Sequence, residues 1–407
     1  MRMALLNFAV AAMAGAFLRY KVSFSLPFVD FKNLLHAHSH FAFAAWISMA
    51  LFALLAGQFL PKEQLEKKSL RTLFLLSQVT SYGMLVSFLL EEYGAVSIAF
   101  STAYIFVTYA FAVVLWRGTK HMKQQLSVLS LRASLIFLAV SSLGPYGLAI
   151  IKATHFISGP LYHNAIYWYL HFQYNGWFSF AIFALFLRMR EQQGIATTVF
   201  RLPLQLMLWS CVPVYLLSIL WIVPPLWVYL IAGTAGMVQL VALVMLFIIF
   251  RKEHKRGEKR SVPQWLFLFV FISFSIKLLL QALSVFPVLN QFVFGHRPVI
   301  IGYLHLVMLG FASFFLIGTA FVQRYIQLSR PLARTGLWIF VAGVLLNEAA
   351  LMAQGFAGIL FLSVRWAPAV LFAAALLLFS GTTLLAFSQR KRGLAQAEAS
   401  TSIPIQS

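Results

Sequence analysis

The stretch LWVYLIAGTAGMVQLVALVMLFIIF, residues 226–250, contains no charged side chain. As a helix rising 1.5 Å per residue it is long enough to cross the roughly 30 Å hydrocarbon core of a bilayer. It is followed directly by RKEHKRGEKR, residues 251–260, in which six of ten side chains are Lys or Arg. An uninterrupted apolar run that ends in a basic cluster is typical of a transmembrane helix.

The rest of the chain repeats this pattern. Hydrophobic residues make up 61% of the 407, and charged residues only 10%, against about 25% in soluble proteins. The sequence therefore predicts an all-α polytopic membrane protein with about twelve transmembrane helices, and it excludes a soluble enzyme with one anchor. The predicted runs are residues 4–20, 37–60, 70–92, 95–116, 131–152, 165–187, 203–223, 226–250, 264–286, 299–322, 333–354 and 365–387.

The predicted domain organisation is simple. No stretch between the runs is long enough for a soluble domain, so residues 1–389 are expected to form a single transmembrane domain. Residues 390–407 are polar and rich in small side chains, which predicts a disordered cytoplasmic tail. The first run lacks a clear cleavage site and is interpreted as a retained helix. Cys211 is the one cysteine, which excludes an intramolecular disulfide.

The distribution of Lys and Arg predicts the orientation. Of the 31 such residues, 24 fall in the two termini and in the loops after the even-numbered runs. Both termini are therefore expected on the cytoplasmic side of a bacterial inner (plasma) membrane. The net charge of +21 is interpreted as this topology signal, with the lipid bilayer as the partner and no role in binding nucleic acid. The oligomeric state is not predicted.

The histidines are concentrated on the opposite, periplasmic side. Of ten, only His121 and His254 fall in basic loops. Ionisable groups inside a membrane are costly and mark functional candidates, and neutral imidazole is a common ligand of metals and heme iron. The eight outer histidines are His36, His38, His40, His155, His163, His171, His296 and His305.

Two motifs predict a heme site. In LLHAHSHFAFAAW, residues 34–46, His36 and His40 share one helix face, and His38 points roughly the opposite way. In YLHLVMLGF, residues 303–311, His305 lies at a depth similar to that of His38. Two such imidazoles on adjacent helices predict the axial ligation of one low-spin heme b, with Gly310, Ala44 and Ala45 letting the flat porphyrin approach the backbone.

A third motif, YWYLHFQYNGW at residues 167–177, carries His171 into the span and makes it a candidate for a metal or redox role. A rebuilt metal site is also considered, in which imidazoles hold copper or zinc. Its candidate ligands are His36, His40, His163 and His171.

Other charged residues are also candidates. Arg297 precedes the tenth run and is predicted to bind a heme propionate, because guanidinium groups pair with carboxylates. Lys277 and Glu348 lie within predicted spans and are expected to pair or to form part of a proton path.

These motifs resemble subunit I of the heme-copper oxidase superfamily, and above all the C-type cytochrome c oxidase and nitric oxide reductase branch with its short relatives. HSHFAFAAW, residues 38–46, is similar to the family's helix 2 motif, with Ala45 in place of a glycine. HLVMLGF, residues 305–311, matches the register of the helix 10 motif. The resemblance implies a subunit I-like bundle with His38 and His305 as the low-spin heme ligands. It places His171 where the family has a copper ligand.

The chain also departs from the family pattern. Tyr303 stands where the family has its high-spin heme ligand, and residues 206–215, in the seventh run, lack the pair of copper-binding histidines. A standard oxygen-reducing binuclear centre is therefore not expected. Tyr303 is interpreted either as a phenolate ligand or as a hydrogen-bonded tyrosine in a vacated pocket.

The sequence therefore predicts a membrane heme protein for electron transfer or for chemistry with a diatomic gas, O2 or NO, with a degenerate second site. A quinol or a separate cytochrome is the expected electron donor. Three alternatives stay open. They are an active oxidase or nitric oxide reductase that uses Tyr303 and His171 as catalytic residues, a metal-ion permease, and a heme-dependent sensor.

Overall fold

The computed structural model describes residues 1–122, 125–154, 159–253, 261–328 and 330–389, and every regular element within these ranges is helical. Eleven helical stretches of this part are long and apolar enough to cross a membrane, which confirms a polytopic helical membrane protein. These are α1 (Arg2–Ser23), α2 to α3 (Phe31–Phe59), α5 (Lys68–Glu91), α6 (Ala95–Gly118), α7 to α8 (Leu126–Ala153), η4 to η5 (Thr198–Ile222), α12 (Leu226–Glu253), α13 (Val262–Leu283), α15 to α16 (Arg297–Val322), α17 (Pro331–Ile359) and α18 (Ala367–Ser388).

The predicted sixth run lies in a further continuous helix made of α9 (Gly159–His171), η3 (Phe172–Phe178) and α10 (Ser179–Gln192). This helix is not among the eleven, because its middle carries His171, Gln173 and Asn175 among its apolar residues, so a count of twelve spans stays a prediction. The shorter helices are α4 (Lys62–Leu65), η2 (Lys120–Met122) and α14 (Pro287–Gly295). The predicted tail, His155 and His254 lie outside the described residues.

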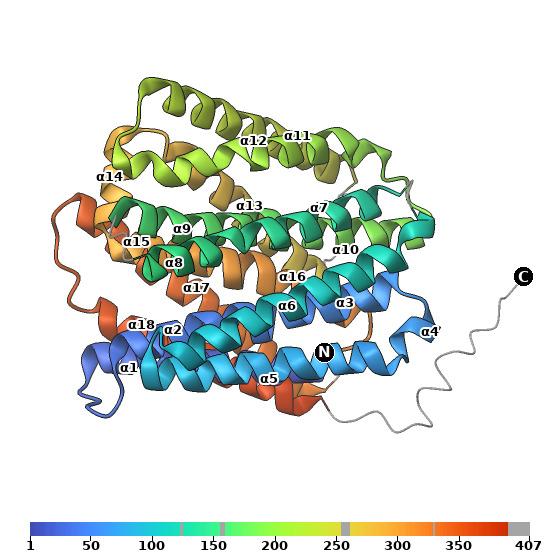
Figure 1. Cartoon of the computed structure of the whole chain (residues 1–407), viewed down its shortest axis with the longest axis horizontal. Coiled ribbons are helices and arrows are strands. Elements are labelled where there is room, and N and C mark those ends of the chain that lie inside the picture. The colour runs from blue at the N-terminus through green and yellow to red at the C-terminus, as the bar shows by residue number, and fades with distance from the viewer. Residues whose placement is uncertain (123–124, 155–158, 254–260, 329, 390–407) are drawn as a thin grey trace, which may run out of the picture.

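The long helices run side by side along the longest axis of the molecule, and the first and last of them, α1 and α18, pack together (Figure 1). α18 also packs tightly along α17. Glycines allow this approach, because a Cβ atom on Gly336 would lie 2.8 Å from the backbone nitrogen of Leu385. A Cβ atom on Gly381 would lie 2.5 Å from that of Phe340. Such close contact of backbones through small residues is typical of helix pairs in membranes.

Three of the long helices contain a π-helical segment: η1 (Ala42–Ser48), η3 and η6 (Leu306–Ser313). π-helical segments are rare and occur frequently at functional sites. Hydrogen bonds from two tryptophans connect the three π-helical segments. The Nε1 of Trp46 in η1 donates to the Oγ of Ser313 in η6 at 2.8 Å, and the Nε1 of Trp177 in η3 donates to the Oγ of Ser48 in η1 at 3.3 Å. η3 and η6 begin directly after His171 and His305, and η1 begins two residues after His40.

The seventh run changes helix type at a proline. α11 (Arg201–Cys211) is followed by the 3-10 helix η5 (Pro213–Ile222), where the sequence predicts one helix. Pro213 has no N–H and cannot continue the α-helical hydrogen bonds. The backbone nitrogen of Tyr215 instead donates to the carbonyl of Val212 at 3.1 Å. The carbonyl of Cys211, its partner in an α-helix, is thereby freed to accept a bond from a side chain.

Candidate functional site

His38 is held against α1 by a single ring nitrogen. It lies in α2 (Phe31–Phe41), and its Nδ1 is 3.0 Å from the carbonyl oxygen of Ala11. Gly15 makes room for the ring, because a Cβ atom there would lie 3.2 Å from the Cε1 of His38. A carbonyl oxygen only accepts hydrogen bonds, so a neutral His38 carries its proton on Nδ1 and its lone pair on Nε2.

His305 has the same chemistry. It is the last residue of α15 (Arg297–His305), and its Nδ1 is 2.8 Å from the carbonyl oxygen of Ile301. The two imidazoles are close enough to interact electrostatically. Each is surrounded by protein atoms yet keeps part of its surface accessible. Within the described ranges, neither Nε2 has a hydrogen-bond partner, so both lone pairs are available to a ligand.

Two arginines lie near these histidines. Arg19, in the last turns of α1, is close enough to His38 and His305 to act on both, and close enough to Arg297 for mutual repulsion. The guanidinium of Arg297 lies 5.4 Å from the ring centre of Phe31. The described residues form two ion pairs, His36–Glu92 and Arg190–Glu253, and neither includes these arginines. Two positive charges therefore converge there without a carboxylate.

From the sequence, Arg297 is predicted as a residue near the heme, and Arg19 is not included. The sequence offers a sign of Arg19, because Arg19 and Lys21 are the basic residues at the C-terminal end of the first run. Its nearness to a tenth-run arginine is set by the packing of the helices.

Gly310, predicted to let a porphyrin approach the backbone, instead faces another helix of the bundle. A Cβ atom on Gly310 would lie 2.5 Å from the Oγ of Ser273 in α13, so the glycine allows two helices to approach. Ala45, a small residue of η1, also contacts other parts of the protein. The carbonyl of Ala45 accepts from the Nδ2 of Asn7 at 2.8 Å, and Ala45 is fully buried. The expectation that Gly310 opens the backbone to a porphyrin is therefore wrong.

His171 is bonded through both ring nitrogens. Its Nε2 is 2.9 Å from the Cys211 carbonyl that Pro213 frees, so Nε2 carries the proton and donates. The amide nitrogen of Asn175, one turn further along, lies 3.0 Å from Nδ1 and donates to it. His171 is 1% exposed. The protein itself therefore satisfies the lone pair that a metal ion would need.

Tyr303 and Lys277 lie in the same region of the bundle. The hydroxyl of Tyr303 donates to the Oε1 of Gln281 at 3.1 Å, as in the hydrogen-bonded interpretation of this tyrosine. Lys277 is 2% exposed, and its Nζ lies 5.3 Å from the ring centre of Phe274. The predicted Lys277–Glu348 pair is not found in the described residues, because Glu348 accepts instead from its neighbour Asn347 at 3.0 Å.

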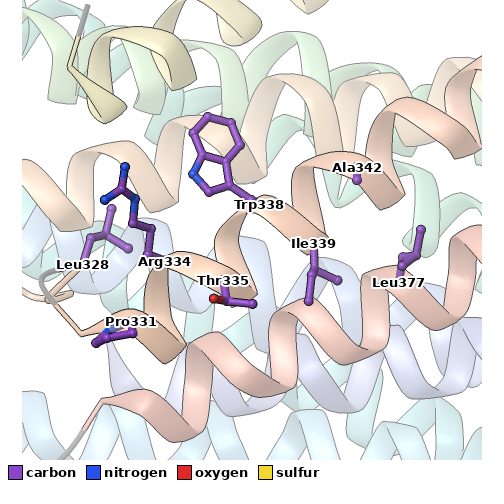
Figure 2. A pocket seen from close by; sticks show the side chains of 8 residues that line it. All are labelled: Leu328, Pro331, Arg334, Thr335, Trp338, Ile339, Ala342 and Leu377. Carbon is purple, nitrogen blue, oxygen red and sulfur yellow. The ribbon is translucent and has the colours of Figure 1, made fainter.

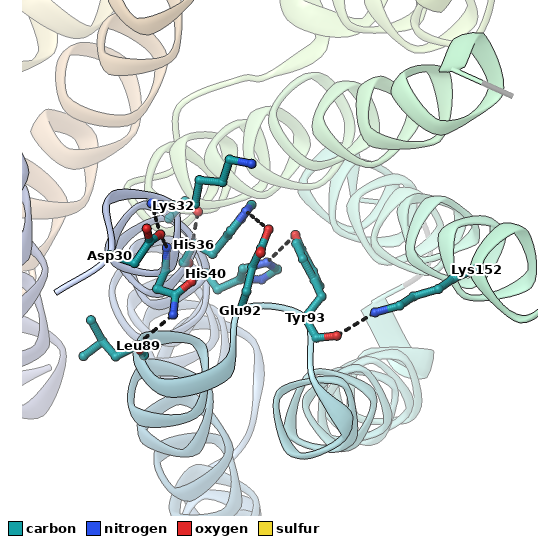
Figure 3. A network of polar contacts seen from close by, with 10 residues as sticks. Asp30, Lys32, His36, His40, Leu89, Glu92, Tyr93 and Lys152 are labelled. Carbon is teal, nitrogen blue, oxygen red and sulfur yellow. Dashed lines mark hydrogen bonds and ion pairs between the residues drawn. The ribbon is translucent and has the colours of Figure 1, made fainter. Parts of the chain in front are cut away.

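His36 and His40 face a separate group at the C-terminal end of α5 (Figure 3). The Nε2 of His36 is 3.6 Å from the Oε1 of Glu92, and the Nε2 of His40 is 3.2 Å from the hydroxyl of Tyr93. Burial raises the pKa of the Tyr93 phenol, which therefore stays protonated. The prediction that His36 and His40 share a face opposite to His38 is confirmed.

The four histidines proposed for a rebuilt metal site are distributed over different places. His36 and His40 face α5, and His171 is in the core. His163 is exposed on α9, with its Nδ1 2.8 Å from the carbonyl of Gly159. In the described part of the chain, no three His, Cys, Asp or Glu side chains are grouped to hold a metal ion.

The comparisons with known proteins add no assignment. No family model matches the chain, and no curated protein is similar to it. What can be said of function therefore rests on the geometry of these residues.

Proposed function

We propose that the chain is a membrane heme protein that holds one b-type heme between His38 and His305 and transfers single electrons through it. One observation carries the proposal. Two histidines from facing helices each have Nδ1 bonded to a backbone carbonyl and a free lone pair on Nε2, close to each other in the bundle.

Metal-binding histidines usually donate their second ring N–H to a carbonyl or carboxylate, which fixes the tautomer and orients the ring. Here the carbonyl oxygens of Ala11 and Ile301 accept this bond from His38 and His305. His163 makes a similar bond to Gly159, but it is exposed at the surface. The distinguishing property of His38 and His305 is that they combine the bond with a position inside the bundle and with nearness to each other.

The charged residues also fit a heme. A heme carries two propionate groups, and the site has two arginines, Arg19 and Arg297, with no carboxylate partner in the described residues. Guanidinium groups bind carboxylates through paired, charge-assisted hydrogen bonds. A heme held there by His38 and His305 would supply one-electron redox chemistry, which suits electron transfer.

The region of His171 favours electron transfer over gas chemistry. Asn175 and the Cys211 carbonyl occupy both nitrogens of His171, and the Oε1 of Gln281 accepts a hydrogen bond from the hydroxyl of Tyr303. A second reactive centre would have to break these bonds. We therefore propose no oxidase or nitric oxide reductase activity for this chain.

A redox titration of the purified protein tests this function. Cells are supplied with a heme precursor, and the heme absorbance is followed against the applied potential. We expect one reversible one-electron transition that accounts for all of the heme. In the same sample, added reductant and mediator should cause no consumption of O2 or NO beyond that of a buffer control.

Two results would contradict the proposal. Protein that contains no redox-active heme would remove its basis. Catalytic consumption of either gas by the purified protein would replace electron transfer with the oxidase or reductase alternative.

A further inference from the structure

Grooves lie where α17 begins, and they are lined by residues other than those of the histidine regions described above. Two adjoining grooves, with volumes of about 720 and 810 Å³, share Leu328 and Arg334 as lining residues. Figure 2 shows Arg334 and Trp338 side by side over the first groove. Volumes of this size are those of sites for small molecules and lipids.

The first groove changes from polar to apolar along α17. Arg334, Trp338 and Ala342 line it at intervals of four residues, so they follow one face of the helix. From Arg334 to Ala342 the face descends about 12 Å at 1.5 Å per residue. Leu377 of α18 forms part of the opposite wall. Trp338 is 40% exposed, as expected for a tryptophan at a membrane–water interface.

The head of the groove is positively charged, and in the described part of the chain it forms no ion pair with an acidic residue. Residues 259–347 contain no Asp or Glu, although they contain seven Lys or Arg. Neither ion pair of the described residues includes Arg334. Arg334 also lies in the first turn of α17, which has no side-chain cap and no acidic residue there. The positive end of the helix dipole and the guanidinium therefore favour the same negatively charged group.

The two helices that form the walls of the groove, α17 and α18, are packed closely together. The approach of α17 to α18 at Gly336 and Gly381 leaves no space for even one added Cβ atom. A site formed by a fixed helix pair loses little conformational entropy when a ligand binds.

We infer that this groove binds an anionic phospholipid, with the phosphate at Arg334 and one acyl chain along Trp338, Ala342 and Leu377. The occupant follows from the combination of charge and shape. A free inorganic anion would satisfy Arg334 but leave the apolar face uncovered. A zwitterionic lipid would cover the face without supplying net negative charge to the arginine. The site lies at the end of the bundle that carries most Lys and Arg, where basic residues attract anionic headgroups.

Native mass spectrometry of the full chain tests this site. The protein is purified in a mild detergent, stripped of lipid, and titrated with phosphatidylglycerol or phosphatidylcholine of matched acyl chains. We expect one tightly retained phosphatidylglycerol per chain and weaker binding of phosphatidylcholine. The Arg334→Gln variant should bind phosphatidylglycerol about fivefold more weakly, equivalent to about 1 kcal/mol for one basic residue at the surface.

Two further variants separate the parts of the site. Ala342→Leu fills the groove while keeping the charge, and it should also weaken phosphatidylglycerol binding. Arg365→Gln is the matched control, because Arg365 is an exposed arginine beside the exposed Trp366 at the other end of the bundle. It should bind phosphatidylglycerol as the wild type does.

The competing outcomes are distinct. Equal binding by wild type and Arg334→Gln, or equal affinity for the two lipids, would overturn the inference. Displacement of the lipid by millimolar inorganic phosphate would identify a site for a free anion instead. Thermal stability of each variant is measured alongside, and the unaffected Arg365→Gln protein shows that loss of an arginine alone does not remove bound lipid.

Discussion

Two histidine regions of this molecule look alike along the chain and differ in their hydrogen bonds. His171 and His305 each stand directly before a π-helical segment, and each lies inside the bundle. Yet His305, like His38, has one nitrogen bonded and one lone pair free, whereas both nitrogens of His171 are satisfied by protein groups. A buried histidine beside a π-helix is therefore not by itself a ligand. What distinguishes the candidates is the free lone pair on Nε2.

The region of His38 and His305 and the region of His171 also differ in the charged residues around them. Arg19 and Arg297 converge near His38 and His305, which suits an anionic cofactor. The cation that acts on His171 is Lys277, which is almost fully buried and has no acidic partner in the described residues. The first region offers an anion two positive charges at the outer ends of helices, and the second encloses a single charge in the core.

The largest expected effect comes from removing the proposed ligands. His38→Ala and His305→Ala should each lower the ratio of heme to purified protein at least about tenfold, because a bis-imidazole site loses half of its axial ligation. His171→Leu should keep the wild-type ratio. His163→Ala serves as the surface control. Heme loss in His171→Leu equal to that in His38→Ala would erase the distinction between the two regions.

Removing the partner of His171 should destabilise the second region without affecting the first. Asn175→Ala leaves the buried Nδ1 of His171 without a donor, which costs about 2 kcal/mol. We expect a lower thermal unfolding temperature and an unchanged heme ratio. The double variant Asn175→Ala, His171→Leu should recover part of the loss, because it removes the unsatisfied nitrogen. A double variant less stable than Asn175→Ala would contradict this explanation.

Neutralising Arg19 should change the heme retention and the midpoint potential of the region around His38 and His305. Arg19→Gln removes a positive charge that favours the ferrous state over the ferric state and that would pair with an anionic propionate. Its loss should therefore weaken heme retention and lower the midpoint potential. A charge contribution of about 1 kcal/mol corresponds to a midpoint potential about 40 mV lower. Arg201→Gln, an exposed arginine on α11, is the control. A potential unchanged in Arg19→Gln would place the arginine outside the range of the cofactor.

The smallest effect concerns the helix that carries His38. The pKa of Asp30 is lowered because its carboxylate accepts the backbone N–H groups of Asn33 and Lys32 at the start of α2. A lowered folded-state pKa means that the stabilisation is present above about pH 4 and is lost as the pH falls through the folded value. Asp30→Asn should keep a cap but lose this acid dependence. Thermal unfolding from pH 3 to pH 7 measures it, and parallel curves for the two proteins would contradict it.

The sequence allowed the apolar helices to be predicted, because an apolar run is a local property, and eleven of the twelve predicted runs lie in helices long and apolar enough to cross a membrane. It also predicted which faces His36, His38 and His40 present, since spacing along a helix fixes direction. The helix types within the spans were not predictable in this way. η1 and η6 are joined by Trp46 and Ser313, which are 267 residues apart in sequence. The Nε2 of His171 is bonded to the carbonyl of Cys211, which lies on another helix and is freed where the helix changes type at Pro213.

The central claim is that one iron is held by both His38 and His305. The most direct measurement is the absorption spectrum of the wild-type protein when oxidised, when reduced, and when reduced under carbon monoxide, with heme counted on the same sample. We predict one b-type heme per chain and a reduced spectrum that carbon monoxide leaves unchanged, because both axial positions are filled. Protein without heme, or a heme that binds carbon monoxide readily, would contradict the account.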